Sequence, residues 1–248
     1  PEVSVITNIG LDHTQFLGTT LEAIAGEKAG IIKPNTPIVI GETQLDTEAI
    51  FRTKAAKEQA PIYFADQLIE TILSTSLKGD YQIHNVRTVL QTVKILNLGA
   101  FTIPTEAVQQ GLLKVTENTG LRGRWEVLGS FPTIICDTAH NREGLSLVFK
   151  QLQSEKFQRL HVVLGMVNDK DVLSLLELFP KQAQYYFCSP NVPRGLEASQ
   201  LAQIFTEHGF EGSLHTSVKD ALKAAKQNAS KEDMIYIGGS TFVVAEII

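Results

Sequence analysis

The sequence has little sulfur, no long apolar run and no basic leader. Its 248 residues include 2 cysteines, 2 methionines and 1 tryptophan. Cys136 and Cys188 lie in the apolar runs TIICD and YYFCS, which predicts buried, reduced thiols and excludes a disulfide-stapled secreted domain. No apolar run reaches the roughly 18 residues of a membrane-spanning helix. The opening PEVSVITNIG does not resemble a signal peptide. We therefore expect a cytoplasmic protein without a membrane partner.

The charge balance also excludes classes of partner. The chain has 22 basic and 27 acidic residues, a net charge of −5, and no basic block, so we expect no nucleic-acid partner. A small anionic substrate remains compatible, because a local site can differ in sign from the whole. A hydrophobic share of 43% is ample for a folded core.

Two nucleotide-binding motifs are missing from the sequence. It contains no GxxxxGK[ST] phosphate loop anywhere and no GxGxxG in its second half, so it carries no complete nucleotide site of a common kind. It also lacks an initiator methionine and opens directly in a strand-like run. We therefore expect a fragment of a longer protein, inactive as a catalyst by itself.

Hydrophobic periodicity divides the chain into two α/β parts. Residues 1–118 read as buried strands alternating with amphipathic helices, and a polar, glycine-punctuated stretch at 116–124 predicts a boundary at 118/119. Strands are expected at 3–9, 37–42 and 61–66, and helices at 21–32 (capped by Thr20), 46–60 (opened by Asp46), 81–97 and 104–115.

The second part, residues 119–248, alternates strand and helix regularly. Strands are expected at 133–137, 160–165, 184–188, 213–216 and 234–238, and helices at 143–154, 169–178, 197–208 and 217–228. Such alternation implies parallel strands with right-handed crossovers. The fold class is therefore α/β: a Rossmann-like, mostly parallel C-terminal domain after the later part of another α/β domain.

The loop NIGLDH and the following helix hold two candidate residues. His13 follows the carboxyl end of a buried strand, where open α/β sheets bind ligands, and could hold a metal or move a proton. A lone loop histidine is more often held by backbone hydrogen bonds, so both interpretations stay open. Lys28 is expected on the helix face that carries Leu21 and Ile24. Its stem could reach solvent, or partial burial could favour a neutral amine that reacts with carbon dioxide.

A second constellation lies at the start of the second part. Arg124 precedes Asp137 by thirteen residues, Asp137 ends a strand, and His140 and Asn141 lie in the loop that leads into a helix. Such a loop can hold an anion. The alternative is that Asn141 is a helix cap and Asp137 a turn residue. Two weaker signals are NDKD at 168–171, where Asn168 or Asp169 would cap a helix, and Gly238–Gly239–Ser240 after the last strand.

Five segments together resemble the folylpolyglutamate synthase/dihydrofolate synthase family of the Mur ligase superfamily. They are ITNIGLDHTQFLGTTLEAIAGEKAGIIKPNTPIVIGE, GRWEV, IICDTAHNREGL, VVLGMVNDKD and YIGGSTFVVAEI, in the family's order over nearly the whole chain. The resemblance implies the end of a central ATP-binding domain (1–118) and a complete C-terminal glutamate ligase domain (119–248). The family's phosphate loop and a glutamate metal ligand would lie upstream.

The resemblance also implies an activity and roles for residues. The expected activity is an ATP-dependent amide ligase that adds L-glutamate to dihydropteroate or to a reduced folate through an acyl phosphate, as a monomer with Mg²⁺. His13 and Lys28, the latter as a carbamate, are expected to hold the metal, and Lys28 and His140 to serve catalysis. The expected nucleotide contacts are Asn85, Arg124, Asp137 and Ser240. Tyr81 stands where the family has histidine, so that stretch matches more loosely.

Two other functions remain open from the sequence. One is another Mur-type ligase, such as a peptidoglycan-precursor ligase, although DHTQFLG with EKAGIIKP resembles those enzymes only loosely. The other is a non-catalytic nucleotide-binding relative that kept the fold and lost the phosphate loop.

Overall fold

The structure, a computed structural model, describes residues 1–12, 14–168 and 171–248. The chain folds into two compact units: unit 1 comprises Pro1–Ser76 and Asp80–Gly120, and unit 2 comprises Leu77–Gly79 and Leu121–Ile248. Residues 77–79 pack with unit 2, which the sequence pattern does not indicate. One contact that holds them is a 3.1 Å hydrogen bond that the Lys78 carbonyl accepts from the buried amide side chain of Gln151.

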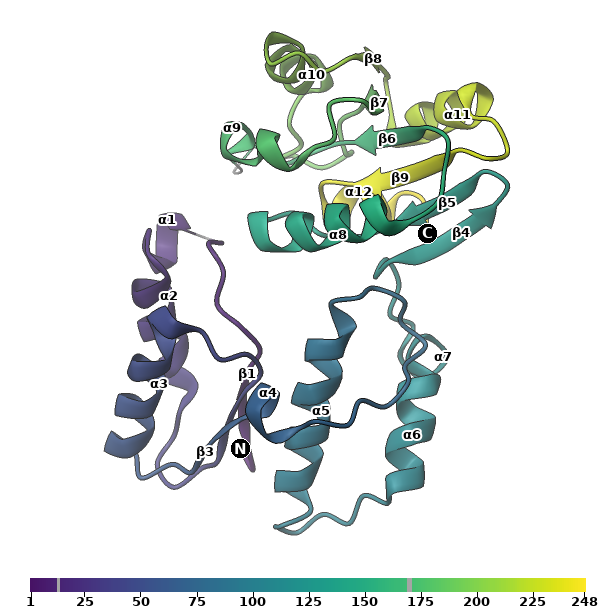
Figure 1. Cartoon of the computed structure of the whole chain (residues 1–248). Helices are drawn as coiled ribbons and strands as arrows, with labels where there is room; N and C mark the ends of the chain where they lie inside the picture. The colour runs from purple at the N-terminus through teal and green to yellow at the C-terminus, as the bar shows by residue number, and fades with distance from the viewer. Residues whose placement is uncertain (13, 169–170) are drawn as a thin grey trace. The chain divides into compact units, whose positions relative to one another are not determined.

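Unit 1 contains a three-stranded parallel sheet in the order β1-β2-β3 (Figure 1). The strands are β1 (Ser4–Ile6), β2 (Ile38–Ile40) and β3 (Ile62–Phe64). Its helices are α1 (Thr14–Leu17), α2 (Leu21–Lys28), α3 (Leu45–Lys57), α4 (Ala65–Leu68), α5 (Gln82–Leu96), α6 (Thr105–Leu113) and α7 (Val115–Thr119), and a 3-10 turn covers Ala29–Ile31.

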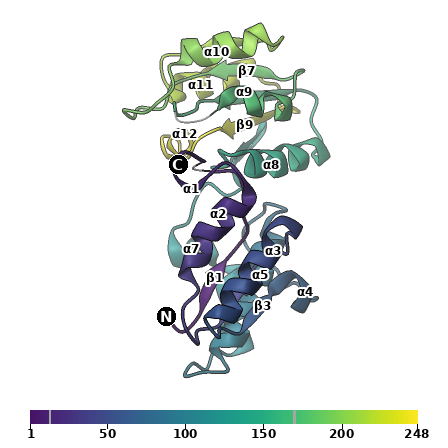
Figure 2. The same cartoon turned by 90° about the vertical axis from the view of Figure 1, so that its left-hand side faces the viewer.

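Helices cover both faces of this small sheet, as Figure 2 shows from a second side. Ile38 and Ile40 of β2 pack with α2 and α3 in one cluster of buried side chains. Val39 points to the other face, where it packs with Ile95 of α5. All three β2 residues are buried, which explains the continuous apolar run in the sequence.

Local chemistry decides where two of these helices begin. Thr20 caps α2 as expected, because its hydroxyl oxygen accepts a 3.2 Å hydrogen bond from the Ala23 amide. Helix α3 begins at Leu45, so the expectation that Asp46 opens it is wrong. Its N-terminal cap, Gln44, holds the loop after β1 with two side-chain hydrogen bonds to the Ile9 backbone, at 2.7 and 2.8 Å.

Unit 2 is built on a six-stranded sheet in the order β4-β5-β9-β6-β7-β8. The strands are β4 (Glu126–Ser130), β5 (Thr133–Cys136), β6 (Leu160–Leu164), β7 (Gln184–Phe187), β8 (Gly212–Leu214) and β9 (Met234–Gly238). The helices are α8 (Arg142–Ser154), α9 (Val172–Leu175), α10 (Ala198–Glu207), α11 (Val218–Asn228) and α12 (Thr241–Ala245), with a 3-10 turn at Leu176–Leu178.

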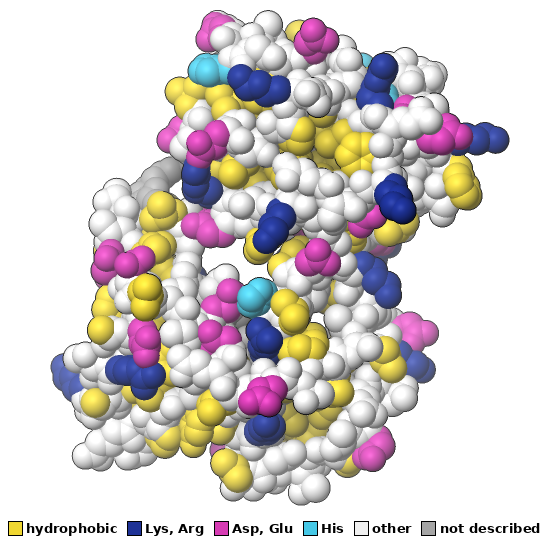
Figure 3. Space-filling model, in the orientation of Figure 1, with side chains coloured by type: hydrophobic (Ala, Val, Ile, Leu, Met, Phe, Trp, Pro, Cys, Tyr) yellow, Lys and Arg dark blue, Asp and Glu magenta, His cyan; other side chains and the backbone are white. Residues whose placement is uncertain are grey.

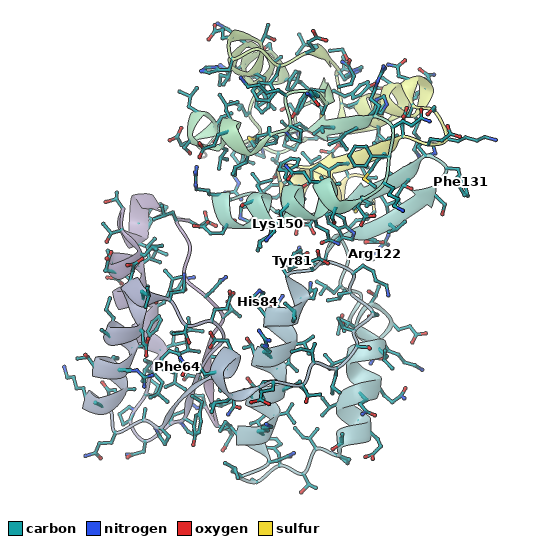
Figure 4. The ribbon with its side chains drawn as sticks, in the orientation of Figure 1. Phe64, Tyr81, His84, Arg122, Phe131 and Lys150 are labelled. Carbon is teal, nitrogen blue, oxygen red and sulfur yellow. The ribbon has the colours of Figure 1, made fainter. Side chains whose placement is uncertain are left out.

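All neighbouring strands of this sheet are parallel except β4, which pairs with β5 in the antiparallel sense. The sequence prediction missed β4. The reason is its exposure: this edge strand contains an exposed Val127 and a Gly129, so it lacks a continuous apolar run. Phe131 stands at the tip of the hairpin that joins β4 to β5 (Figure 4).

Two layers of helices enclose this sheet. On one face, α11 and α12 pack on Ile134, Val163 and Ile237. On the other face, Phe149 of α8 and Phe205 of α10 contact aromatic side chains of the strands, including Tyr236 and Tyr185. Cys136 and Cys188 are free and fully buried, which confirms the prediction that both thiols are buried.

The expected helix at 169–178 is shorter than predicted. Helix α9 begins at Val172, and Asp171 caps it by accepting a 3.4 Å hydrogen bond from the Ser174 amide. The prediction that Asn168 caps this helix is therefore wrong, and Asp169 lies outside the described residues.

A buried polar network holds the amino-terminal edge of the unit 2 sheet. The ring of His161 lies 2.9 Å from the Tyr186 hydroxyl and 3.3 Å from a carboxylate oxygen of Asp233. The same carboxylate oxygen accepts a 2.8 Å hydrogen bond from the Ser230 amide. Every side chain of this network has a partner, which is what a buried polar group requires.

In the described part of the chain, no helix combines the length and the hydropathy that crossing a bilayer requires.

Candidate functional site

The carboxyl edge of the unit 2 sheet gathers most of the predicted site. Strands β5, β9, β6 and β7 are parallel neighbours, so the loops after them all leave the sheet at one edge. In open α/β sheets ligands bind at this edge. The loop after β5 carries Asp137 and His140, and the loop after β9 carries Ser240.

Arg124 stands on a tight turn just before β4. Its two neighbours, Gly123 and Trp125, have φ angles of +70° and +47°. The Gly123 amide donates to Glu126 at 2.8 Å, and the Gly123 carbonyl accepts from the Thr138 amide at 3.0 Å. A side chain at position 123 would lie 2.8 Å from Cγ1 of Val244, so only glycine fits. Arg124 is half-buried, with Nη1 3.4 Å from the Gly123 carbonyl.

The carboxylate of Asp137 joins this turn to the end of β5. Asp137 is buried, and one oxygen accepts a 2.7 Å hydrogen bond from the Trp125 amide. Its other oxygen accepts from the Ala139 amide at 2.8 Å. The structure therefore brings Arg124 and Asp137 together, as the sequence predicts, and gives the Asp137 carboxylate an evident structural task.

His140 and Ser240 are held by their own loops. The Nδ1 atom of His140 lies 2.9 Å from the Thr138 carbonyl, and the ring is half-buried. Ser240 is 2% exposed and caps α12, because its hydroxyl accepts from the Phe242 amide at 3.2 Å. Ser240 therefore has a capping role, and its expected nucleotide contact stays a prediction. Asn141 caps α8 by accepting from the Gly144 amide at 2.9 Å, which confirms the cap interpretation.

The two cysteine thiols near this edge are unreactive. Burial, with the negative charges of Glu126 and Asp137 as smaller causes, raises the pKa of the Cys136 thiol to about 12. Burial likewise raises the pKa of Cys188 to about 12. A thiol this far from its thiolate is a poor nucleophile, so neither cysteine is a candidate for covalent catalysis.

The carboxyl edge of the unit 1 sheet holds a polar cluster that the sequence prediction missed. Glu42, directly after β2, accepts a 2.9 Å hydrogen bond from the Asn8 side chain, and its other oxygen lies 3.3 Å from Nδ1 of His84. Figure 4 shows His84 at the N-terminal end of α5. A β-carbon on Gly41 would stand 2.4 Å from the Thr7 carbonyl, so β2 passes the loop after β1 at close range. The available signal was the acidic residue that ends the expected strand at 37–42.

Asn85 follows His84 in the first turn of α5. It is exposed, and its side-chain nitrogen donates to Gln82 at 2.9 Å. It also lines an apolar groove of about 340 Å³ together with Val5 and Val89. The predicted nucleotide contact is therefore accessible and lies beside an apolar surface.

The predicted metal site receives no support from the described residues. His13 lies outside them. Lys28 is exposed, so the expectation that it shares the buried face of α2 with Ile24 is wrong. Among residues 1–12, 14–168 and 171–248, no three His, Cys, Asp or Glu side chains come close enough to hold a metal ion. The metal roles expected for His13 and Lys28 stay predictions, and we assign no chemical step to a metal.

Charge is mixed over the face drawn in Figure 3, where basic and acidic side chains alternate on both units. Over this face, no block of like charge marks an anion-binding surface.

Comparisons with known proteins identify relatives along the whole chain. Residues 123–241 match the family described as "Mur ligase, glutamate ligase domain". A probable dihydrofolate synthetase of Schizosaccharomyces pombe is 34% identical over all of this chain and 65% of its own length. The solved structure of E. coli FolC in complex with DHPP and ADP is 25% identical, with a TM-score of 0.85 over 99% of this chain and 60% of that one.

A second solved structure adds glutamate to the ligands seen in relatives. It is a bifunctional folylpolyglutamate synthase/dihydrofolate synthase with Mn, AMPPNP and L-glutamate bound, 28% identical with a TM-score of 0.81 over 99% of this chain and 61% of that one. The chain spans between 32% and 65% of the length of the curated relatives it matches.

Proposed function

We propose that the chain belongs to the folylpolyglutamate synthase/dihydrofolate synthase family of Mur ligases and that it works in an ATP-dependent ligase that adds L-glutamate to a folate or its precursor. The observation that carries the proposal is the likeness to FolC over 99% of the chain, in a structure whose ligands are DHPP and ADP. The named relatives are folate ligases, which favours this reading over a peptidoglycan-precursor ligase.

The proposed reaction solves a specific chemical problem. A carboxylate is a poor electrophile, so one of its oxygens first attacks the γ-phosphorus of ATP, and ADP leaves. The neutral amine of L-glutamate then attacks the carbonyl of this acyl phosphate, loses a proton, and expels phosphate with the original carboxylate oxygen. The acceptor is dihydropteroate or the terminal glutamate of a reduced folate. Both steps concentrate negative charge on phosphoryl oxygens, which positioned cations and amides stabilise.

Arg124 is the cation that unit 2 offers for this charge. Its guanidinium is planar and always charged, and can bind a phosphate or ribose oxygen through two N–H groups. The positive-φ residues on both sides fix where the side chain leaves the backbone. Asp137 holds the turn, and its role as a nucleotide contact rests on the family resemblance. In this proposal, His140 is a polar contact for the nucleotide near this turn, and Ser240 shapes the loop after β9.

Unit 1 contributes Asn85, whose exposed amide can contact the nucleotide base beside the apolar groove.

The roles of His13 as a metal ligand and Lys28 as a carbamate rest on the family resemblance alone. A carbamate on Lys28 would supply hard oxygen ligands, the type that Mg²⁺ prefers. In the complete natural protein, Lys28→Ala and Lys28→Arg should then both abolish activity, because arginine keeps the charge without the carboxylate oxygens. An active Lys28→Arg variant would remove the carbamate from the proposal.

The test of the proposed function is phosphate release by the complete natural protein. ATP hydrolysis is followed with dihydropteroate and then with tetrahydrofolate, each with and without L-glutamate. We expect release that requires acceptor and glutamate together, with the glutamylated product identified by mass spectrometry. ADP binding without any product would instead support a non-catalytic nucleotide-binding relative. Product from an amino acid other than glutamate would contradict the proposed substrate.

A further inference from the structure

The turn that carries Arg124 is an unusual piece of backbone. Gly123 and Trp125, on either side of it, both have positive φ angles, and for tryptophan this conformation is strained. A turn of this kind persists only where the surroundings hold it. The amides of both flanking residues donate to carboxylates: Trp125 to Asp137 at 2.7 Å and Gly123 to Glu126 at 2.8 Å.

Glu126 is the local half of this clamp. It is the first residue of β4, and its side chain is 23% exposed. One oxygen accepts from the Gly123 amide at 2.8 Å, and the other accepts from Nε of Arg122 at 2.5 Å. Arg122, marked in Figure 4 at the approach to β4, is 43% exposed. The Glu126 carboxylate thus links Arg122 and Gly123, which precede Arg124, to the first residue of β4, which follows it.

We propose that Glu126 is a positioning residue for Arg124, and this inference rests on the proposed function of Arg124 as a nucleotide contact. Its bond to the Gly123 amide keeps the peptide before Arg124 in the left-handed turn. Arg124 then leaves the backbone in one direction, which a planar, two-pronged donor needs more than a point charge does. An error of about 1 Å in such a group is enough to weaken binding strongly.

Three variants separate positioning from charge. Glu126→Ala removes the acceptor for the Gly123 amide. Glu126→Gln keeps one acceptor oxygen of the same reach for the Gly123 amide, and loses the charge and the second oxygen, which accepts from Arg122. Arg122→Ala is the matched control, because it removes the other partner of the same carboxylate and leaves the Gly123 bond in place. An exposed ion pair of this kind contributes little by itself.

The first measurement reports on the turn without any nucleotide. Trp125 is the single tryptophan of this 248-residue chain and is 3% exposed, so its fluorescence reports the turn directly. We expect iodide quenching of Trp125 to rise several-fold in Glu126→Ala and to stay unchanged in Glu126→Gln and Arg122→Ala. Unchanged protection of Trp125 in Glu126→Ala would overturn the proposal, whatever the activity of the protein proves to be.

The second measurement uses the complete natural protein and separates KM from kcat. We expect Glu126→Ala to raise the KM for ATP about ten-fold, the equivalent of one charge-assisted hydrogen bond, with the KM for glutamate unchanged. Glu126→Gln should recover most of this loss. A purely structural role would lower kcat per total protein with an unchanged KM for ATP, and that result would overturn the proposal. An unaltered protein that fails to use ATP would instead contradict the proposed function.

Discussion

Replacing Asp137 by alanine removes the acceptor of two backbone amides at once. The Trp125 amide is buried with its hydrogen bond, and the Ala139 amide is partly buried. Hydrogen bonds to a charged group contribute about 1.5–3 kcal/mol each, and water can replace the carboxylate only at the more open of the two. We therefore expect Asp137→Ala to lower the free energy of unfolding of unit 2 by about 3 kcal/mol. For a domain of this size that corresponds to roughly 10 °C in Tm.

The assay is urea denaturation of this chain followed by tryptophan fluorescence. Because the single tryptophan, Trp125, belongs to unit 2, the signal reports that unit alone. Asp137→Asn is the control: it keeps the shape and one acceptor oxygen, and should cost about 1–2 kcal/mol. An Asp137→Ala variant that unfolds within about 0.5 kcal/mol of the unaltered chain would refute the reasoning, because that is the range of a surface substitution without a structural task.

Three other predictions concern stability and reactivity. Gly41→Ala should destabilise unit 1 by about 2–3 kcal/mol, because the new β-carbon would lie 2.4 Å from a backbone oxygen. Gly26→Ala, inside α2, should stabilise the unit by up to about 1 kcal/mol, because nothing lies within 4 Å of the new β-carbon; thermal melts followed by circular dichroism measure both effects. Cys136 and Cys188 should react with a disulfide reagent only after unfolding, and rapid reaction of the folded chain at pH 8 would contradict this prediction. Because burial raises the pKa of both thiols from 9.0 to about 12, the free energy of unfolding should fall as the pH rises from 9 to 12. Burial alone would raise the pKa of Asp233, but hydrogen bonds from a backbone amide and a histidine ring outweigh it, so the pKa lies below the ordinary 3.8. The contribution of Asp233 to the free energy of unfolding should be present above pH 3.8 and disappear as the pH falls below it. Asp233→Asn should flatten this part of the stability-against-pH curve.

Much of the fold followed from periodicity. Continuous apolar runs and the regular alternation of strand and helix placed all three strands of unit 1 and five of the six in unit 2, including the exposed edge strand β8. The exception, β4, is an antiparallel edge strand that stands outside this alternation and has exposed positions. The short helices α1, α4, α7 and α12 were missed because four or five residues do not show a helical period.

The candidate site was predictable in part. Motifs placed Arg124 and Asp137 at one loop, and the structure brings them together through the Trp125 amide. Neither the left-handed turn nor the task of Glu126 could be predicted, since both depend on backbone angles and on contacts between residues three apart. The exposure of Lys28 was missed because the sequence analysis expected one helix over 21–32, whereas α2 ends at Lys28 and a 3-10 turn follows at Ala29–Ile31.

The most direct test of the proposed mechanism follows the oxygen atoms of the acceptor. Dihydropteroate with both carboxylate oxygens replaced by a heavy isotope is given to the complete natural protein with ATP and L-glutamate. If the carboxylate is activated as an acyl phosphate, each turnover transfers one heavy oxygen to the released phosphate and leaves the other in the new amide. Phosphate that forms together with product but carries no heavy oxygen would contradict the account.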